Sequence, residues 1–250
     1  MKKFVIWLFV LNLSLSMQGQ TLHTIMMCNM NDRTLARGNE GEVREMRSLI
    51  PTLATSLGYK NNMIVHSGQE FTYTMLNQEI SKLNVLEGDI VIFYYASHGV
   101  NWSDSEWPHM AFSDRQYGEQ TIYNLLKQKF SQAKLILCIA ACCNMDAEGQ
   151  ARQKRSYGNI DPKLVKELFI GFEGHRSYIA SSSIRGQYSW VWTGGNRPGH
   201  MFGIALRDAI VSACKGEIRS EWDYVFESAK SKTLIYSEQK QMPQYQKNRW

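Results

Sequence analysis

Two apolar segments of this sequence each end in side chains that can take part in acid–base or nucleophilic chemistry. The segment "DIVIFYYASHG" (89–99) ends in His98 and Gly99. In "KLILCIAACCN" (134–144), Cys142 and Cys143 directly precede the last residue. A cysteine thiolate is a strong nucleophile, and a neighbouring imidazole can remove the thiol proton or pair with the thiolate. The first question is whether the fold brings these two segment ends together.

Stretches with strand and helix character alternate along most of the chain. The expected strands are 22–30, 62–67, 89–99, 134–144 and 177–183. The expected helices are 42–59, which Pro51 should kink or divide, 72–84, 119–132, 161–172, 199–216 and 221–237. The turn formers of 31–41 predict a loop. Continuous apolar strands separated by helices predict an α/β fold whose parallel sheet is covered on both faces. Sites in such sheets gather at the carboxyl ends of strands, so His98 and the cysteines should meet.

The residues alone leave two interpretations of this pair open. In the first, the thiolate and His98 act on a carbonyl group, and backbone amides at the strand ends form an oxyanion hole. Gly99 would allow the backbone to approach a ligand closely. In the second, His98 is a hydrogen-bonded core residue and the cysteines pack as small apolar side chains. A Cys–His pair has no fixed sequence spacing that would decide between them.

The composition is typical of a globular protein and argues against several kinds of partner. Of 250 residues, 44% are hydrophobic and 20% are charged, which allows one large buried core. Only "ARQKR" (151–155) forms a basic cluster, so no nucleic-acid binding is expected. His23, His66, His109 and His175 lack metal-ligand spacing. We therefore expect neither a metal nor a cofactor.

Residues 1–20 have the order of a secretory signal peptide. Lys2 and Lys3 precede an apolar stretch from Phe4 to about Leu15, and small and polar residues follow. An uncleaved anchor is the alternative, although the stretch is short for a membrane span. We expect an exported protein, periplasmic or secreted, with one domain over 21–250 and no stable membrane insertion after cleavage. Exported proteins usually form disulfides, but an odd number of cysteines, three of them in one apolar strand, predicts packing plus one reactive thiol.

The two segments resemble the signature blocks of the caspase–metacaspase clan of cysteine peptidases, in which one strand ends in His-Gly and the next in the nucleophilic cysteine. Further stretches resemble the clan over most of the mature chain: "RGNEGEVREMRSLIPTLATSLGY" its first loop and helix, "ASSSIRGQYSW" its substrate-binding strand, "GHMFGIALRDAI" the following helix, and "QMPQY" its final segment. The resemblance implies a caspase-like three-layer sandwich with a mostly parallel sheet of about six strands.

The resemblance also implies roles for individual residues. His98 would be the general base or acid, and Cys143 the nucleophile that forms a thioester acyl-enzyme with a peptide or protein substrate. Cys143 is preferred because metacaspases often end this strand in two cysteines of which the second reacts, and Cys142 would then point toward the core by alternation. The amides of Gly99 and Cys143 would form the oxyanion hole.

Substrate-binding residues are expected at Arg37, Arg185 and Gln187. Metacaspases use acidic residues to bind basic P1 side chains, but this chain has Ala141 and Arg185 at two such positions. Caspases use arginines to hold a P1 aspartate, and Arg37 lies in the matching first loop. An arginine facing a basic side chain would repel it, so acidic or neutral P1 residues are expected. Each arginine is otherwise an ordinary exposed loop residue.

Two features bear on the activity. The basic loop 146–160 lies where caspases carry the linker that is cut on activation, and it is otherwise a solvated loop tip. Ala141 and Asn144 depart from the clan's pattern around the nucleophile. This departure keeps an alternative open, in which the protein is a catalytically silent member of the fold that acts as a binding or scaffold protein. An exported esterase is disfavoured because the chain lacks a Gly-x-Ser-x-Gly elbow.

Overall fold

A computed structural model describes residues 19–101, 105–143, 159–194 and 197–249 of the chain. The expected signal peptide falls almost entirely outside these ranges, and so does most of the basic loop 146–160. In the described residues, no helix is both long enough and apolar enough to cross a membrane.

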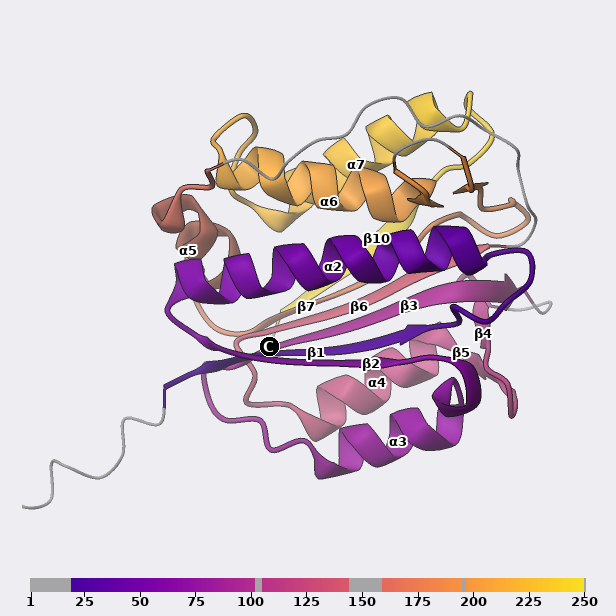
Figure 1. Cartoon of the computed structure of the whole chain (residues 1–250). Helices are drawn as coiled ribbons and strands as arrows, with labels where there is room; N and C mark the ends of the chain where they lie inside the picture. Colours follow the sequence, from indigo (N-terminus) through magenta and orange to yellow (C-terminus); the bar gives the residue numbers. More distant parts are fainter. Residues whose placement is uncertain (1–18, 102–104, 144–158, 195–196, 250) are drawn as a thin grey trace, which may run out of the picture.

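A twisted sheet runs through the middle of the molecule (Figure 1). From one edge to the other, its strands are β10 (Gln244–Arg249), β7 (Arg176–Ser181), β6 (Leu135–Cys143), β3 (Ile90–Val100), β1 (Thr21–Cys28) and β2 (Lys60–His66). All neighbours pair in parallel except β10, which is antiparallel to β7. This confirms the expected mostly parallel sheet of about six strands.

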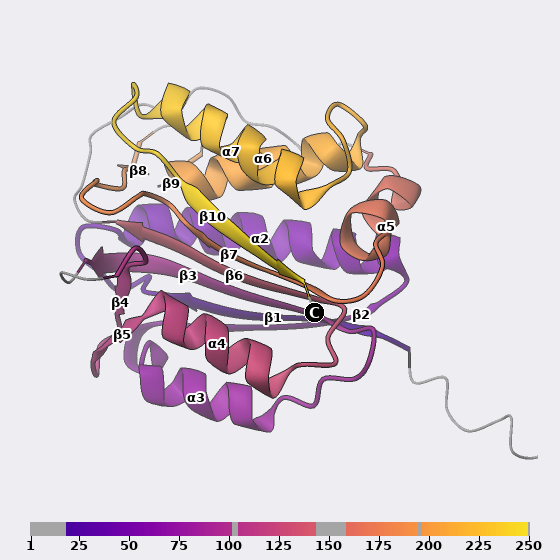
Figure 2. The same cartoon turned by 180° about the vertical axis from the view of Figure 1, so that it is seen from behind.

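Helices cover both faces of this sheet (Figures 1 and 2). One face carries α2 (Ala36–Leu57), α5 (Pro162–Ile170), α6 (Met201–Cys214) and α7 (Trp222–Tyr236), and the other carries α3 (Tyr73–Lys82) and α4 (Glu119–Lys129). Successive strand residues point to opposite faces. Thus Ile92 and Tyr94 of β3 pack in the core beneath α2, while Val91 and Phe93 pack in the core against α3 and α4. The expected three-layer sandwich is confirmed.

Several short elements complete the carboxyl end of the sheet and its surroundings. They are the 3-10 turn η1 (Gly68–Glu70), the hairpin of β4 (His109–Ala111) and β5 (Gln116–Gly118), and the two-stranded ribbon of β8 (Val191–Trp192) and β9 (Gly199–His200). The strand β4 pairs antiparallel with the last residues of β3. The hairpin therefore extends β3 beyond the point where the parallel sheet stops.

The helix α2 begins at Ala36, six residues before the predicted start at 42, and Pro51 does not divide it. Gly38 and Gly41 contributed to the prediction of a loop over 31–41. In the structure, both positions need a residue without a side chain because other segments pack directly against them. A Cβ atom at Gly41 would lie 1.9 Å from the carbonyl oxygen of Pro198, and one at Gly38 would lie 2.4 Å from a methyl group of Val191. Close contact with the segment before α6 thus outweighs the weak helix propensity of glycine.

Candidate active site

The ends of β3 and β6 lie side by side, as the sequence predicted. The two strands are parallel neighbours, and the register pairs His98 with Cys143. Both positions are at the carboxyl end of the sheet. The backbone of Cys143 is described, but its side chain lies outside the described part of the structure. The backbone thus places the two positions side by side, and the meeting of imidazole and thiol remains a prediction.

The His98 imidazole contacts a carboxylate that sequence reasoning missed. Its Nε2 atom lies 3.0 Å from Oδ2 of Asp32, which is 66 residues away in the sequence, and 3.4 Å from the hydroxyl of Thr34. The His98 side chain is 42% exposed and that of Asp32 18% exposed. A half-exposed imidazole with a carboxylate partner can both reach a ligand and hold a proton. The turn formers around Asp32 predicted only a loop there.

Two contacts fix the end of β3 around His98. The Tyr95 hydroxyl donates to the carbonyl of His98 at 2.6 Å and also lies 3.1 Å from that of Ala111 in β4. Gly99 pairs with Met110 of β4. A Cβ atom at Gly99 would lie 2.6 Å from Cβ of Cys142, so glycine is required here by packing between β3 and β6. The expected role of the Gly99 amide in an oxyanion hole remains a prediction.

The described cysteine side chains are buried and reduced. Cys142 packs in the core against α3 and α4, as the alternation argument expected. Burial raises the pKa of the Cys28 and Cys138 thiols well above the ordinary value and that of Cys214 to about 12. These three thiols are therefore protonated and unreactive at neutral pH.

Of the expected substrate-binding residues, both arginines are exposed. Arg37 lies in the first turn of α2 rather than in a loop, because the helix starts early. Arg185 follows Ile184 in a turn that Gly186 allows with a φ of 78°. The side-chain oxygen of Gln187 accepts a hydrogen bond from the amide of Met242 at 2.8 Å, so it ties this turn to the C-terminal segment.

Gln241 is a further organising residue that the sequence did not reveal. It is fully buried, and its Nε2 atom donates to the carbonyl of Ser182 at 2.9 Å and to the hydroxyl of Ser189 at 3.2 Å. Its Oε1 atom accepts from the amide of Trp190 at 2.8 Å. The amide group thus joins the end of β7 to the segment "SW" (189–190), which the resemblance assigned to substrate binding.

A buried polar cluster lies behind the strand ends, between α2 and α6. Glu42 binds the Arg207 guanidinium, accepts from the Tyr94 hydroxyl at 2.6 Å and accepts from the amide of His200 at 2.8 Å. Burial would raise the pKa of the Glu42 carboxyl, but Arg207 and the other donors lower it below the ordinary value. The His200 ring donates from Nε2 to Oδ1 of Asn39 at 2.8 Å. Glu42 is therefore a buried, paired carboxylate.

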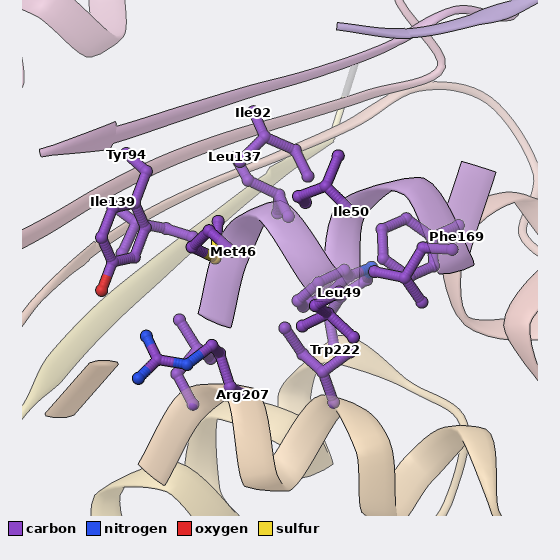
Figure 3. A pocket seen from close by; sticks show the side chains of 13 residues that line it. Met46, Leu49, Ile50, Ile92, Tyr94, Leu137, Ile139, Phe169, Arg207 and Trp222 are labelled. Atoms are coloured by element: carbon purple, nitrogen blue, oxygen red, sulfur yellow. The ribbon is translucent and has the colours of Figure 1, made fainter. Parts of the chain in front are cut away.

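An apolar cavity lies in the core beside this cluster and away from the strand ends (Figure 3). Its walls include Met46 and Leu49 of α2, Ile92 of β3 and Trp222 of α7. Tyr94 and Arg207 line it as well and lie on the same side in Figure 3. The cavity is therefore a packing defect of the core face and is not part of the candidate active site. Within the described ranges, no group of three or more metal-ligating side chains comes together.

Comparison with known proteins gives a consistent result. A family model described as a caspase domain matches residues 25–249. Caspase-1 from Spodoptera frugiperda is similar in structure, with a TM-score of 0.55 and 16% identity over 92% of this chain and 88% of that chain. A crystal structure of a protein from Geobacter sulfurreducens has a TM-score of 0.52 and 11% identity over 92% of this chain and 94% of that one. No curated protein sequence matches significantly. At these identities the structural likenesses establish the fold alone.

Proposed function

This chain belongs to the caspase-domain family, and from that premise we propose that it is an exported cysteine endopeptidase that uses His98 and Cys143. The observation that carries the proposal is the pairing of these two residues at the carboxyl ends of adjacent parallel strands. Cys143 is preferred over Cys142 because the Cys142 side chain is buried in the core between the sheet and the helices α3 and α4. Successive strand residues face opposite sides of the sheet, so Cys143 does not point into that core.

The proposed reaction proceeds in two stages. The Cys143 thiol gives its proton to His98, and the thiolate attacks the carbonyl carbon of the scissile peptide bond. The amides of Gly99 and Cys143 stabilise the resulting oxyanion. His98 then returns the proton to the leaving amine as the C–N bond breaks, which leaves a thioester. Water attacks the thioester while His98 accepts its proton, and the C–S bond then breaks to release the carboxylic acid. The Cys143 sulfur takes the proton back from His98, which restores the thiol.

The proposed substrate is a peptide or protein with an acidic or neutral P1 residue. Arg37 and Arg185 both carry a positive charge and are exposed at the surface. Ala141, where metacaspases place an acid, is fully buried and offers no charge to a basic side chain. Guanidinium groups bind carboxylates through paired hydrogen bonds and repel lysine and arginine side chains.

The test compares the two neighbouring cysteines on matched peptides that end in Asp, Ala or Arg. We expect Cys143→Ala to abolish hydrolysis of every peptide, while Cys142→Ala keeps most of it. The wild type should cleave the peptides ending in Asp or Ala faster than the one ending in Arg. Full activity in Cys143→Ala would contradict the assignment. Binding of peptides by the wild type without any hydrolysis would instead support the alternative, a silent scaffold protein.

A further inference from the structure

Asp32 and His98 form a side-chain contact between a carboxylate oxygen and the Nε2 atom of the imidazole. The Oδ2 to Nε2 distance is 3.0 Å, which is a normal charge-assisted hydrogen bond. Because Asp32 engages Nε2, the nitrogen left to exchange a proton at the strand ends is Nδ1. The two side chains come from separate elements, since Asp32 precedes α2 and His98 ends β3.

The Asp32 carboxyl is held in a fixed orientation by its own turn. Its Oδ1 atom accepts hydrogen bonds from the amides of Thr34 and Leu35 at 2.8 and 2.9 Å and from the Thr34 hydroxyl at 2.7 Å. The backbone carbonyl of Asp32 accepts from the amide of Ala36, the first residue of α2. With Oδ1 satisfied in this way, Oδ2 is directed to His98.

The same hydrogen bonds keep Asp32 ionised. Burial would raise the pKa of this carboxyl, but the donors from Thr34 and Leu35, together with His98, lower it below the ordinary value. Asp32 is therefore negative at neutral pH. A carboxylate on Nε2 selects the tautomer with the proton on Nε2 and stabilises the doubly protonated ring that forms when Nδ1 accepts a proton.

We propose that Asp32 is a positioning residue that orients His98 and stabilises its protonated form while Cys143 reacts. The proposal rests on the proposed function of His98 and Cys143. It extends that function from a pair of residues to an ordered set of three, in which the carboxylate that precedes α2 holds the histidine through Nε2. Asp32 does not touch the substrate, so it acts only through the imidazole.

The variant Asp32→Asn separates this role from the turn. Its amide oxygen can still accept from Thr34 and Leu35, but its NH2 group cannot accept a proton from Nε2 of His98. We expect kcat to fall about 100-fold with KM within about twofold of the wild type, because general acid–base catalysis contributes about that much or more. Asp32→Ser, which can also cap the turn but does not reach His98, should behave alike.

The matched control is Asp161→Asn, at the N-cap of α5. Asp161 also accepts a backbone hydrogen bond, from Lys163 at 2.8 Å, but it lies by Cys214 at the far end of α6. Its kcat should stay within about twofold of the wild type, and thermal unfolding would show that all variants are folded.

A second measurement does not depend on peptide cleavage. The rate at which iodoacetamide labels Cys143 reports the thiolate that His98 stabilises. We expect this rate at neutral pH to fall about tenfold in Asp32→Asn and Asp32→Ser, as in His98→Ala, but not in Asp161→Asn. Labelling in Asp32→Asn at the wild-type rate, with a loss in His98→Ala, would overturn the role of Asp32. If the wild type cleaves no peptide, the proposed function fails, and labelling still decides the role of Asp32.

Discussion

Two histidines near the same end of the molecule differ in the group that each one binds. His98 is half exposed and contacts the carboxylate of Asp32, whereas His200 is fully buried and contacts the amide oxygen of Asn39. Both partners belong to α2 or to the turn that begins it. A single stretch of about eight residues thus supplies a charged acceptor to one imidazole and a neutral acceptor to the other.

The difference shows how the environment gives one residue type two uses. Burial lowers the pKa of His200 to about 4, with Glu42 opposing this and Arg207 and His98 adding to it. At neutral pH, His200 is therefore an uncharged donor that helps to hold α6 on α2. His98 has a carboxylate beside it and solvent access, which suits proton transfer. The comparison separates a histidine that stabilises the fold from the one to which the proposed function gives the proton transfers.

The largest expected effect comes from the buried cluster that surrounds His200. In Glu42→Gln, the buried guanidinium of Arg207 loses its counterion, and breaking such a pair costs about 3–5 kcal/mol. The free energy of unfolding, from urea denaturation, should fall by about that amount. Glu45→Gln on the same helix removes the partner of Arg44, whose side chain is 57% exposed, and it should change stability by less than about 1 kcal/mol. Equal losses in the two variants would contradict the importance of burial.

The next effect is a loss of stability in acid. Between about pH 6.5 and pH 4 the unfolded chain protonates His200 while the folded protein does not, so stability falls as the pH falls through this range. The lowered pKa of Glu42 acts in the same direction. For His200 the loss is on the order of 3 kcal/mol.

Urea midpoints measured across this pH range would show the loss. The variant His200→Gln can retain a donor toward Asn39 but does not titrate, so its stability should depend less steeply on pH. A slope identical to that of the wild type would show that other groups cause the acid loss.

The smallest effect is expected for Thr34→Val beside His98. The hydroxyl of Thr34 is one of three donors to Oδ1 of Asp32, and the two backbone amides remain when it is lost. One hydrogen bond contributes about 1 kcal/mol, so kcat/KM should fall about threefold to fivefold. Thr52→Val, whose hydroxyl donates to the carbonyl of Ser48 on an exposed part of α2, should leave kcat/KM unchanged. A loss above about 30-fold would mean that Thr34 acts on His98 directly.

The sequence by itself determined the sheet, the helices on its faces and the place of His98 and Cys143 at the strand ends. Continuous apolar runs define β3 and β6, and parallel strands put their carboxyl ends at one edge. His98 and Cys143 could therefore be paired before any contact was known. The inward position of Cys142 followed from alternation in the same way. These features depend on hydrophobic runs and side-chain alternation within short segments, so they can be recognised without knowing any tertiary contact.

Only the tertiary structure decided which side chains support the site. Asp32 meets His98 across 66 residues, and Gln241 reaches Ser182 across 59. The early start of α2 likewise depends on the close contact between Gly41 and Pro198. Residues so far apart in the sequence become partners only when the elements that carry them pack against each other, and no pattern within a short segment indicates this. Turn formers near Asp32 indicate a loop in any fold. Only packing starts the helix at Ala36, directly after that loop, and brings the Asp32 carboxylate to the imidazole of His98.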